Sequence, residues 1–160
     1  MNTLYTKMIE YYSGDPKRIQ HFTKVHSYAR LIGQLEHLSD DTQNILEIAA
    51  LVHDIGIKIS ELKYGNCNGK LQEKEGPAIA KKLLEKLGFD KDVSDRVQYL
   101  IAHHHTYDNI DGIDYQILVE ADFLVNIMES DLSKEAASKA YHTIFKTTCG
   151  KTICREMFGI

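Results

Sequence analysis

Proline and cysteine are both scarce in this chain, and each scarcity excludes a class of protein. Only two prolines occur in 160 residues, which favours helices because proline interrupts them. The three cysteines, Cys67, Cys149 and Cys154, are an odd number at spacings that suit neither a zinc ribbon nor a disulfide framework. We therefore expect reduced thiols.

The chain also lacks a long apolar run and an excess of basic residues. No stretch approaches the roughly 18 apolar residues of a membrane span, and residues 1–5 do not begin a secretion signal. The net charge of −4 argues against a nucleic-acid polymer or an anionic membrane as a partner, because binders of both concentrate Lys and Arg. We expect a cytoplasmic protein.

Apolar residues recur instead at helical spacing, and no strand-like alternation or internal repeat occurs. We predict an all-α fold with one domain over residues 1–160, a bundle of six to eight helices. The motif-bearing core covers residues 15–130, and a C-terminal helix and tail cover 133–160. The expected helices span 3–12, 16–38, 40–53, 76–87, 90–106, 115–129 and 134–148.

Helix caps and one polar segment complete this outline. Asp15, Ser39 (or Asp40) and Ser133 precede three expected helices as N-caps. Residues 64–76 are rich in glycine and asparagine, so we expect a long loop there that is functional or mobile. This loop is expected to form a pocket wall with three further side chains: Lys58, Lys63 and Tyr107.

The mainly apolar stretch 46–52 ends in His53-Asp54, and Gly56 follows. A histidine beside a carboxylate at the end of a core helix needs partners, because a buried charge is costly unless it is paired or metal-bound. Hydrogen bonds in the core would satisfy a lone histidine, whereas the adjacent pair favours a metal site. Gly56 allows another backbone or a ligand to come close.

Another expected helix contains two histidines. His21 shares a face with Val25 and Ala29, so its imidazole is expected to point into the core. His26 lies five residues further on and is expected to face away from the core.

Asp122 lies on the apolar stripe of its own expected helix, with Leu118 and Val125. A carboxylate there either makes a buried hydrogen bond or ion pair, or binds a metal. Glu120 falls off the stripe, and we expect it to be solvated.

His103, His104 and His105 end the expected helix 90–106. His104 continues the apolar face of Val97 and Leu100 and should point inward, and at most one of its two neighbours can share that direction. The run is either a surface feature that binds metal adventitiously or the wall of a pocket. Its place before a polar turn favours the pocket.

The inward-facing candidates make a mixed set of nitrogen and oxygen ligands: His21, His53, Asp54 and Asp122. Such a set suits a divalent ion such as Mn, Fe, Ni, Co, Zn or Mg better than Ca. Four protein ligands leave room in an octahedral site for a water and a phosphate oxygen. The ion would activate the water and stabilise negative charge on phosphorus.

This order of motifs resembles the HD-domain superfamily of metal-dependent phosphohydrolases. The resemblance covers residues 15–129, and its strongest part is the segment Leu51-Val52-His53-Asp54-Ile55-Gly56. It implies an HD-type helical bundle as the fold. It also implies that the metal ligands are His21, His53, Asp54 and Asp122.

The sequence departs from several subgroups of that family. Many members continue as His-Asp-Ile-Gly-Lys, whereas Ile57 precedes Lys58 here, which leaves a phosphate-binding role of Lys58 open. The Glu-Asp pair of guanosine tetraphosphate hydrolases and the Gly-Tyr-Pro motif of cyclic-di-GMP phosphodiesterases are absent.

The number of ions is also left open. Dinuclear members of the family place another histidine before the helix expected at Gly76, where this chain has only Gln72, Glu73 and Glu75. We therefore favour one ion. A second ion would use His103, His104 or Glu73.

The sequence thus predicts a hydrolase of phosphate esters, with a small nucleotide or related metabolite as the substrate. Asp54 would assist deprotonation of the water, and His104 or His103 would neutralise the phosphate or protonate the leaving group. The alternatives are a di-iron oxygenase and a binding or sensing module with a structural metal. The sequence does not fix the oligomeric state.

Overall fold

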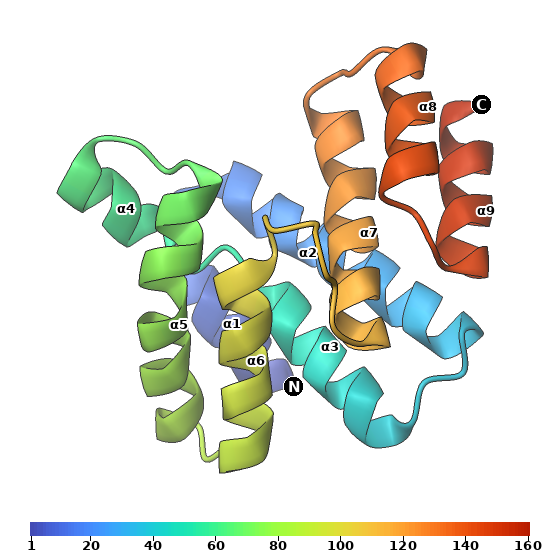
Figure 1. Cartoon of the computed structure of the whole chain (residues 1–160). Helices are drawn as coiled ribbons and strands as arrows, with labels where there is room; N and C mark the ends of the chain where they lie inside the picture. Colours follow the sequence, from blue (N-terminus) through green and yellow to red (C-terminus); the bar gives the residue numbers. More distant parts are fainter.

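The computed structural model describes all 160 residues, and its secondary structure consists of nine α-helices and no strand (Figure 1). In chain order the helices are α1 Asn2–Tyr11, α2 Pro16–Leu35, α3 Asp40–Val52, α4 Ile57–Tyr64, α5 Gly69–Lys86, α6 Lys91–His103, α7 Ile113–Glu129, α8 Lys134–Thr143 and α9 Thr148–Phe158. The all-α prediction is confirmed. The helix count exceeds the predicted range because 57–64 and 148–158 are also helical. None of the helices is both long and apolar enough to cross a membrane.

The expected helix caps explain why several helices begin where they do. The side chains of Asp15, Ser39 and Ser133 each accept a hydrogen bond from the backbone N–H three residues further on. Pro16 is the first residue of α2, a position where its missing N–H has no cost. The three cysteines are free thiols.

The core is one cluster of 31 buried residues built mainly around α2, α3 and α7. Figure 1 shows the α5–α6 pair and the α8–α9 pair on opposite sides of these central helices. Because α2 packs against both α3 and α7, it buries two sides. The prediction that His26 faces away is therefore wrong: it is buried, and its Nε2 lies 3.3 Å from Oε2 of Glu47 on α3.

The prediction of a long loop at 64–76 is also wrong, because α5 begins at Gly69 and continues through Gly76-Pro77. The Asn68 side chain caps the new first turn. A buried glutamate in the second turn, Glu73, accepts hydrogen bonds from the backbone N–H of His105 and the hydroxyl of Thr106. These contacts with the end of α6 hold the turn in place, so tertiary structure overrides the loop-like composition.

The expected close approach at Gly56 is present. A Cβ atom on Gly56 would lie 2.8 Å from the carbonyl oxygen of Gln72 and 2.8 Å from the backbone nitrogen of Gly76. A Cβ on Gly76 would in turn lie 2.6 Å from Ile101. The two glycines therefore let α5 pack directly on the turn that carries His53 and Asp54.

The C-terminal region differs from the prediction in two ways. The helix capped by Ser133 ends at Thr143, and α9 follows in the tail. Glu120, expected in solvent, is fully buried, because the α8–α9 connection covers it. Its carboxylate accepts hydrogen bonds from the backbone N–H groups of Lys146 and Thr147, 2.6 and 2.9 Å away.

Candidate metal centre

His53 and Asp54 lie in the turn that follows α3. The last two turns of this helix are almost wholly buried, so the turn lies inside the molecule. His53 is completely buried, and its Nδ1 lies 2.9 Å from the carbonyl oxygen of Ala50. This contact turns the other ring nitrogen, Nε2, toward α2 and α7.

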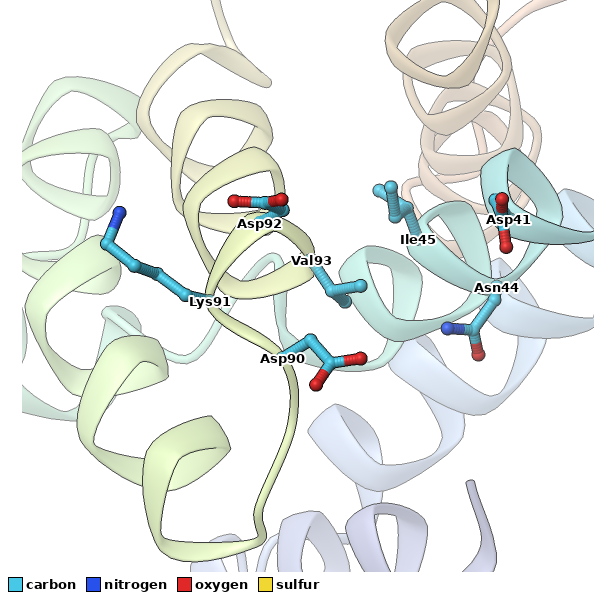
Figure 2. A pocket seen from close by; sticks show the side chains of 7 residues that line it. All are labelled: Asp41, Asn44, Ile45, Asp90, Lys91, Asp92 and Val93. Carbon is cyan, nitrogen blue, oxygen red and sulfur yellow. The ribbon is translucent and has the colours of Figure 1, made fainter.

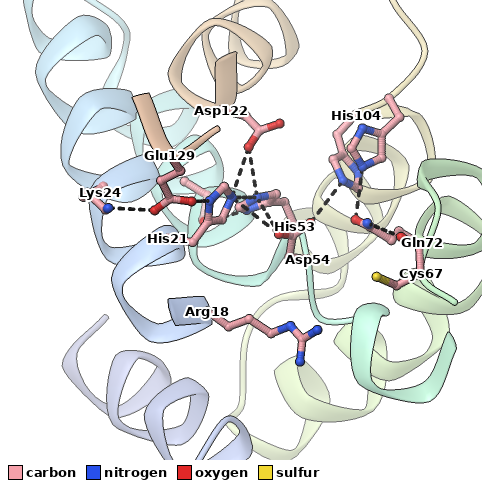
Figure 3. Close-up of polar contacts among 12 residues, drawn as sticks. Arg18, His21, Lys24, His53, Asp54, Cys67, Gln72, His104, Asp122 and Glu129 are labelled. Atoms are coloured by element: carbon pink, nitrogen blue, oxygen red, sulfur yellow. Dashed lines mark hydrogen bonds and ion pairs between the residues drawn. The ribbon is translucent and has the colours of Figure 1, made fainter. Parts of the chain in front are cut away.

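Two neighbouring helices bring the remaining predicted ligands to this turn (Figure 3). Nε2 of His21, on α2, lies 3.3 Å from Nε2 of His53 and 3.4 Å from Oδ2 of Asp54. Oδ1 of Asp122, on α7, lies 3.2 Å from the His21 nitrogen and 3.6 Å from the His53 nitrogen. The structure thus brings together all four residues of the predicted ligand set.

The donor atoms of these residues fit a divalent cation. Nδ1 of His21 lies 2.9 Å from Oε2 of Glu129, as Nδ1 of His53 lies near a carbonyl oxygen, so each neutral ring carries its proton on Nδ1. Both Nε2 atoms then direct a lone pair toward each other and toward two carboxylate oxygens. Only positive charge between them relieves this repulsion, and imidazole and carboxylate donors are typical ligands of Mn, Fe, Ni, Co or Zn.

The pKa values show the same requirement for positive charge. Burial lowers the pKa of His21, but the hydrogen bond to Asp122 and the charge of Asp54 outweigh it and raise the pKa to about 9. Burial raises the pKa of Asp54, but His53 and His104 outweigh it and lower the pKa to about 2. A metal ion that binds here therefore displaces a proton.

A second layer of charge holds His21 in place. The carboxylate of Glu129 accepts from Nδ1 of His21 through Oε2, and its Oε1 lies 2.6 Å from Nζ of Lys24. Sequence analysis did not identify Glu129, although it lies seven residues after Asp122 and therefore on the same face of α7. A carboxylate behind a ligating histidine fixes the ring orientation and raises its basicity.

Comparison with known proteins agrees with this arrangement. The family model of the HD domain matches residues 18–140, a range that contains all four predicted ligands. This chain belongs to the HD-domain family. A solved structure, that of a predicted HD superfamily hydrolase from an uncultured Thermotogales bacterium, shares the fold, with 22% identity and a TM-score of 0.73. The similarity covers 99% of this chain and 85% of that chain. No curated protein matches the chain.

A second group of donors lies on the other side of Asp54 in this HD domain. Oδ1 of Asp54 lies 3.6 Å from Nε2 of His104, whose Nδ1 lies 2.8 Å from the carbonyl oxygen of Ile101. The His104 Nε2 atom is buried, has no hydrogen-bond partner and faces Asp54. His105 completes this group. Asp54 therefore faces one group of histidines with each of its two oxygens.

His105 is the neighbour that shares the direction of His104, a choice that the sequence left open. Its Nε2 lies 3.1 Å from Oε1 of Gln72 on α5. Burial and the adjacent His104 lower the pKa of His105 to about 4, so its ring is neutral at pH 7. No sequence signal identifies this residue, because its direction depends on the turn after α6.

The structure places Lys58 and His103 outside both groups. The Lys58 amine donates to the carbonyl oxygen of Tyr11 and lies over the Tyr11 ring, near the start of the chain. The His103 ring stacks on Tyr99, with 4.3 Å between the ring centroids. Ile57 begins α4, so Lys58 already lies on that helix, and its amine contacts α1 rather than either group.

The ligand cluster opens to solvent through a cavity of about 250 Å³. Lys17, Arg18 and Asn126 line it together with His21, Asp54 and Asp122, whereas the buried His104 does not. Both basic residues come from the first turn of α2. The cavity therefore opens beside the N-terminal end of this helix.

A separate hollow of about 530 Å³ lies between the starts of α3 and α6 (Figure 2). Three aspartates, Asp41, Asp90 and Asp92, line it, and it contains no histidine or cysteine. Acidic residues are common in the first turn of a helix because they interact favourably with its dipole. This hollow is accordingly not the candidate centre.

Proposed function

We propose that this chain is a metal-dependent hydrolase that cleaves a phosphate ester of a small metabolite. The observation that carries the proposal is the convergence of two imidazole lone pairs and two carboxylates at the inner end of a solvent-accessible cavity. The proposed ion ligands are His21, His53, Asp54 and Asp122. A divalent ion bound there would lower the pKa of water and stabilise charge that develops on phosphorus.

The chain's own residues have distinct proposed roles around the reacting group. Asp54 accepts a hydrogen bond from the attacking water and assists its deprotonation, because its carboxylate lies at the cavity wall. Arg18, whose guanidinium is held by Asp15 and Glu61, donates its remaining N–H groups to the phosphate oxygens, a role that the contact of Lys58 with Tyr11 does not support. His104, buried behind Asp54, orients that carboxylate rather than protonating the leaving group.

The test is hydrolysis by the purified chain of a panel of phosphomonoesters and phosphodiesters with Mn²⁺ or Ni²⁺. The double variant His53→Ala/Asp54→Asn should lose about 10²–10⁴-fold in kcat/KM, since it lacks two ligands and the general base. His142→Ala removes an exposed histidine of α8 and serves as the matched control. Turnover by the double variant at the wild-type rate would refute the proposal.

A di-iron oxygenase is the second candidate, and one observation favours it. Asp54 directs Oδ2 toward His21 and His53 and Oδ1 toward His104, so one carboxylate could serve two ions. Two irons per chain by elemental analysis, together with substrate-dependent oxygen consumption, would support the oxygenase. Two ions with phosphate release and no oxygen consumption would support a dinuclear hydrolase. One ion with phosphate release would support the mononuclear hydrolase that the sequence favours.

A further inference from the structure

A second hollow continues from the metal centre along the outer faces of α2 and α7. Its volume is about 550 Å³. It shares three lining residues with the cavity at the metal centre, which are Lys17, Asn126 and Glu129. We call this hollow the polar groove. A phosphate ester held at the centre would extend its leaving group into this groove.

Several polar side chains in the groove have no partner within the chain. Lys17 forms no ion pair, and the side chains of Gln20, Asn126 and Ser130 form no hydrogen bond with other residues. Lys24 differs, because its amine is already paired with Glu129. The groove thus offers one cation and three neutral hydrogen-bonding groups to a ligand.

The charge of the groove favours an anion. Lys17 and Lys24 outnumber Glu129 by one positive charge, in a chain whose net charge is −4. Lys17 also lies in the first turn of α2, where the helix dipole favours negative charge. The acid Glu129 is already paired with Lys24 and does not oppose an anion at Lys17.

The groove also lacks what a nucleobase requires. No aromatic residue lines it, and Pro16 is the only side chain without a polar group. Proteins that bind exposed bases commonly stack them on aromatic rings. Hydroxyl groups, by contrast, match the amides of Gln20 and Asn126.

From these features we infer the class of substrate, on the basis of the proposed hydrolase function. The scissile phosphate binds at the metal centre, and the groove selects a small hydroxylated leaving group that carries a second anionic group. Phosphorylated sugar acids, hydroxy acids and polyol bisphosphates belong to this class. Nucleoside monophosphates do not, although a small nucleotide is one of the substrates that the sequence predicts.

The experiment uses phosphonates, whose carbon–phosphorus bond ester hydrolysis does not break. The probes are methylphosphonate, 2-hydroxy-3-phosphonopropionate and the 5′-phosphonate analogue of AMP. Binding to the Mn²⁺-loaded chain is measured by isothermal titration calorimetry. 2-Hydroxy-3-phosphonopropionate should bind about tenfold more tightly than methylphosphonate. The AMP analogue should bind no more tightly than methylphosphonate.

Lys17→Met should abolish most of that tenfold preference. Lys86→Met is the control. It removes an exposed lysine of α5 that forms no ion pair, and it should leave the preference unchanged. The inference fails if the AMP analogue binds most tightly. It also fails if Lys17→Met weakens all three probes equally, since that result indicates general attraction rather than recognition.

Hydrolysis of the corresponding esters separates this inference from the proposed function. Selective, Lys17-dependent binding without phosphate release would refute the hydrolase and leave the groove assignment intact. Phosphate release with no dependence of selectivity on Lys17 would refute the groove assignment and leave the hydrolase intact.

Discussion

The contact between Glu129 and His21 leads to a quantitative prediction about metal affinity. The Glu129 carboxylate accepts from Nδ1 of His21 at 2.9 Å and is held by Lys24 at 2.6 Å. Glu129→Gln keeps the shape but removes the charge, so His21 becomes a weaker ligand with a less fixed ring. Loss of such a partner typically weakens metal binding by about 10–100-fold.

The position of Glu129 sets the expected value within that range. Its side chain is 30% exposed, so water competes with the interaction. We expect a loss of about tenfold, or about 1.4 kcal/mol. Lys24→Met should weaken binding less, by about 2–5-fold, because partly exposed ion pairs contribute only about 0–1 kcal/mol.

The assay is competition between the protein and a chromophoric chelator for Mn²⁺ at fixed pH and ionic strength. Glu156→Gln is the matched control, since Glu156 is an exposed glutamate paired with Arg155 on α9, distant from the centre. A Glu129→Gln affinity within twofold of the wild type would refute the reasoning. In that case packing alone, and not the carboxylate, orients His21.

Three predictions concern stability. Gly56→Ala should destabilise the fold by about 1–3 kcal/mol because its Cβ meets backbone atoms of α5, whereas Gly33→Ala, whose Cβ meets a flexible glutamine side chain, should cost less in denaturant unfolding. Glu120→Ala should cost about 1–3 kcal/mol by leaving backbone N–H groups of the α8–α9 connection unpaired, with faster hydrogen exchange there and unchanged metal affinity. Burial raises the pKa of Glu73, but hydrogen bonds from Lys70 and neighbouring groups outweigh it and hold this pKa below its usual value. The ionised carboxylate therefore stabilises the fold above its unfolded-state pKa, and this contribution is lost as the pH falls through the lower folded-state pKa. The difference in unfolding free energy between wild type and Glu73→Gln should therefore shrink at acidic pH, and a difference independent of pH would contradict this assignment.

The convergence of the four candidate ligand residues could be predicted because each lies on, or at the end of, a helix with a clear apolar face. His21 and Asp122 occupy inward positions of α2 and α7, and His53 follows a buried segment of α3. Periodicity gives the direction of such side chains without knowledge of the partner helix. It cannot show how many sides of a helix are covered, which is why His26 and Glu120 were assigned to the surface.

Residues 64–76 could not be predicted for a different reason. Glycine and asparagine in this segment indicate a loop by local preference. The segment is nevertheless helical from Gly69, because Glu73 and Gln72 make contacts with the residues that follow α6. Contacts between segments so far apart in the sequence leave no periodic signal. The position of His105 depends on the same contacts and was missed with them.

The turn after α3 connects the positions of the candidate ligands with that of His105. Gly56 allows the backbone of α5 to lie against the turn, and this approach places Gln72 beside His105. The approach therefore sets the distance between the second group of histidines and Asp54, while His21 and Asp122 are held independently by α2 and α7. If this is correct, a side chain at Gly56 disturbs the environment of His105 and leaves that of His21 intact. NMR chemical shifts of the two imidazoles in Gly56→Ala distinguish them, and equal changes at both would show that α5 supports the whole centre.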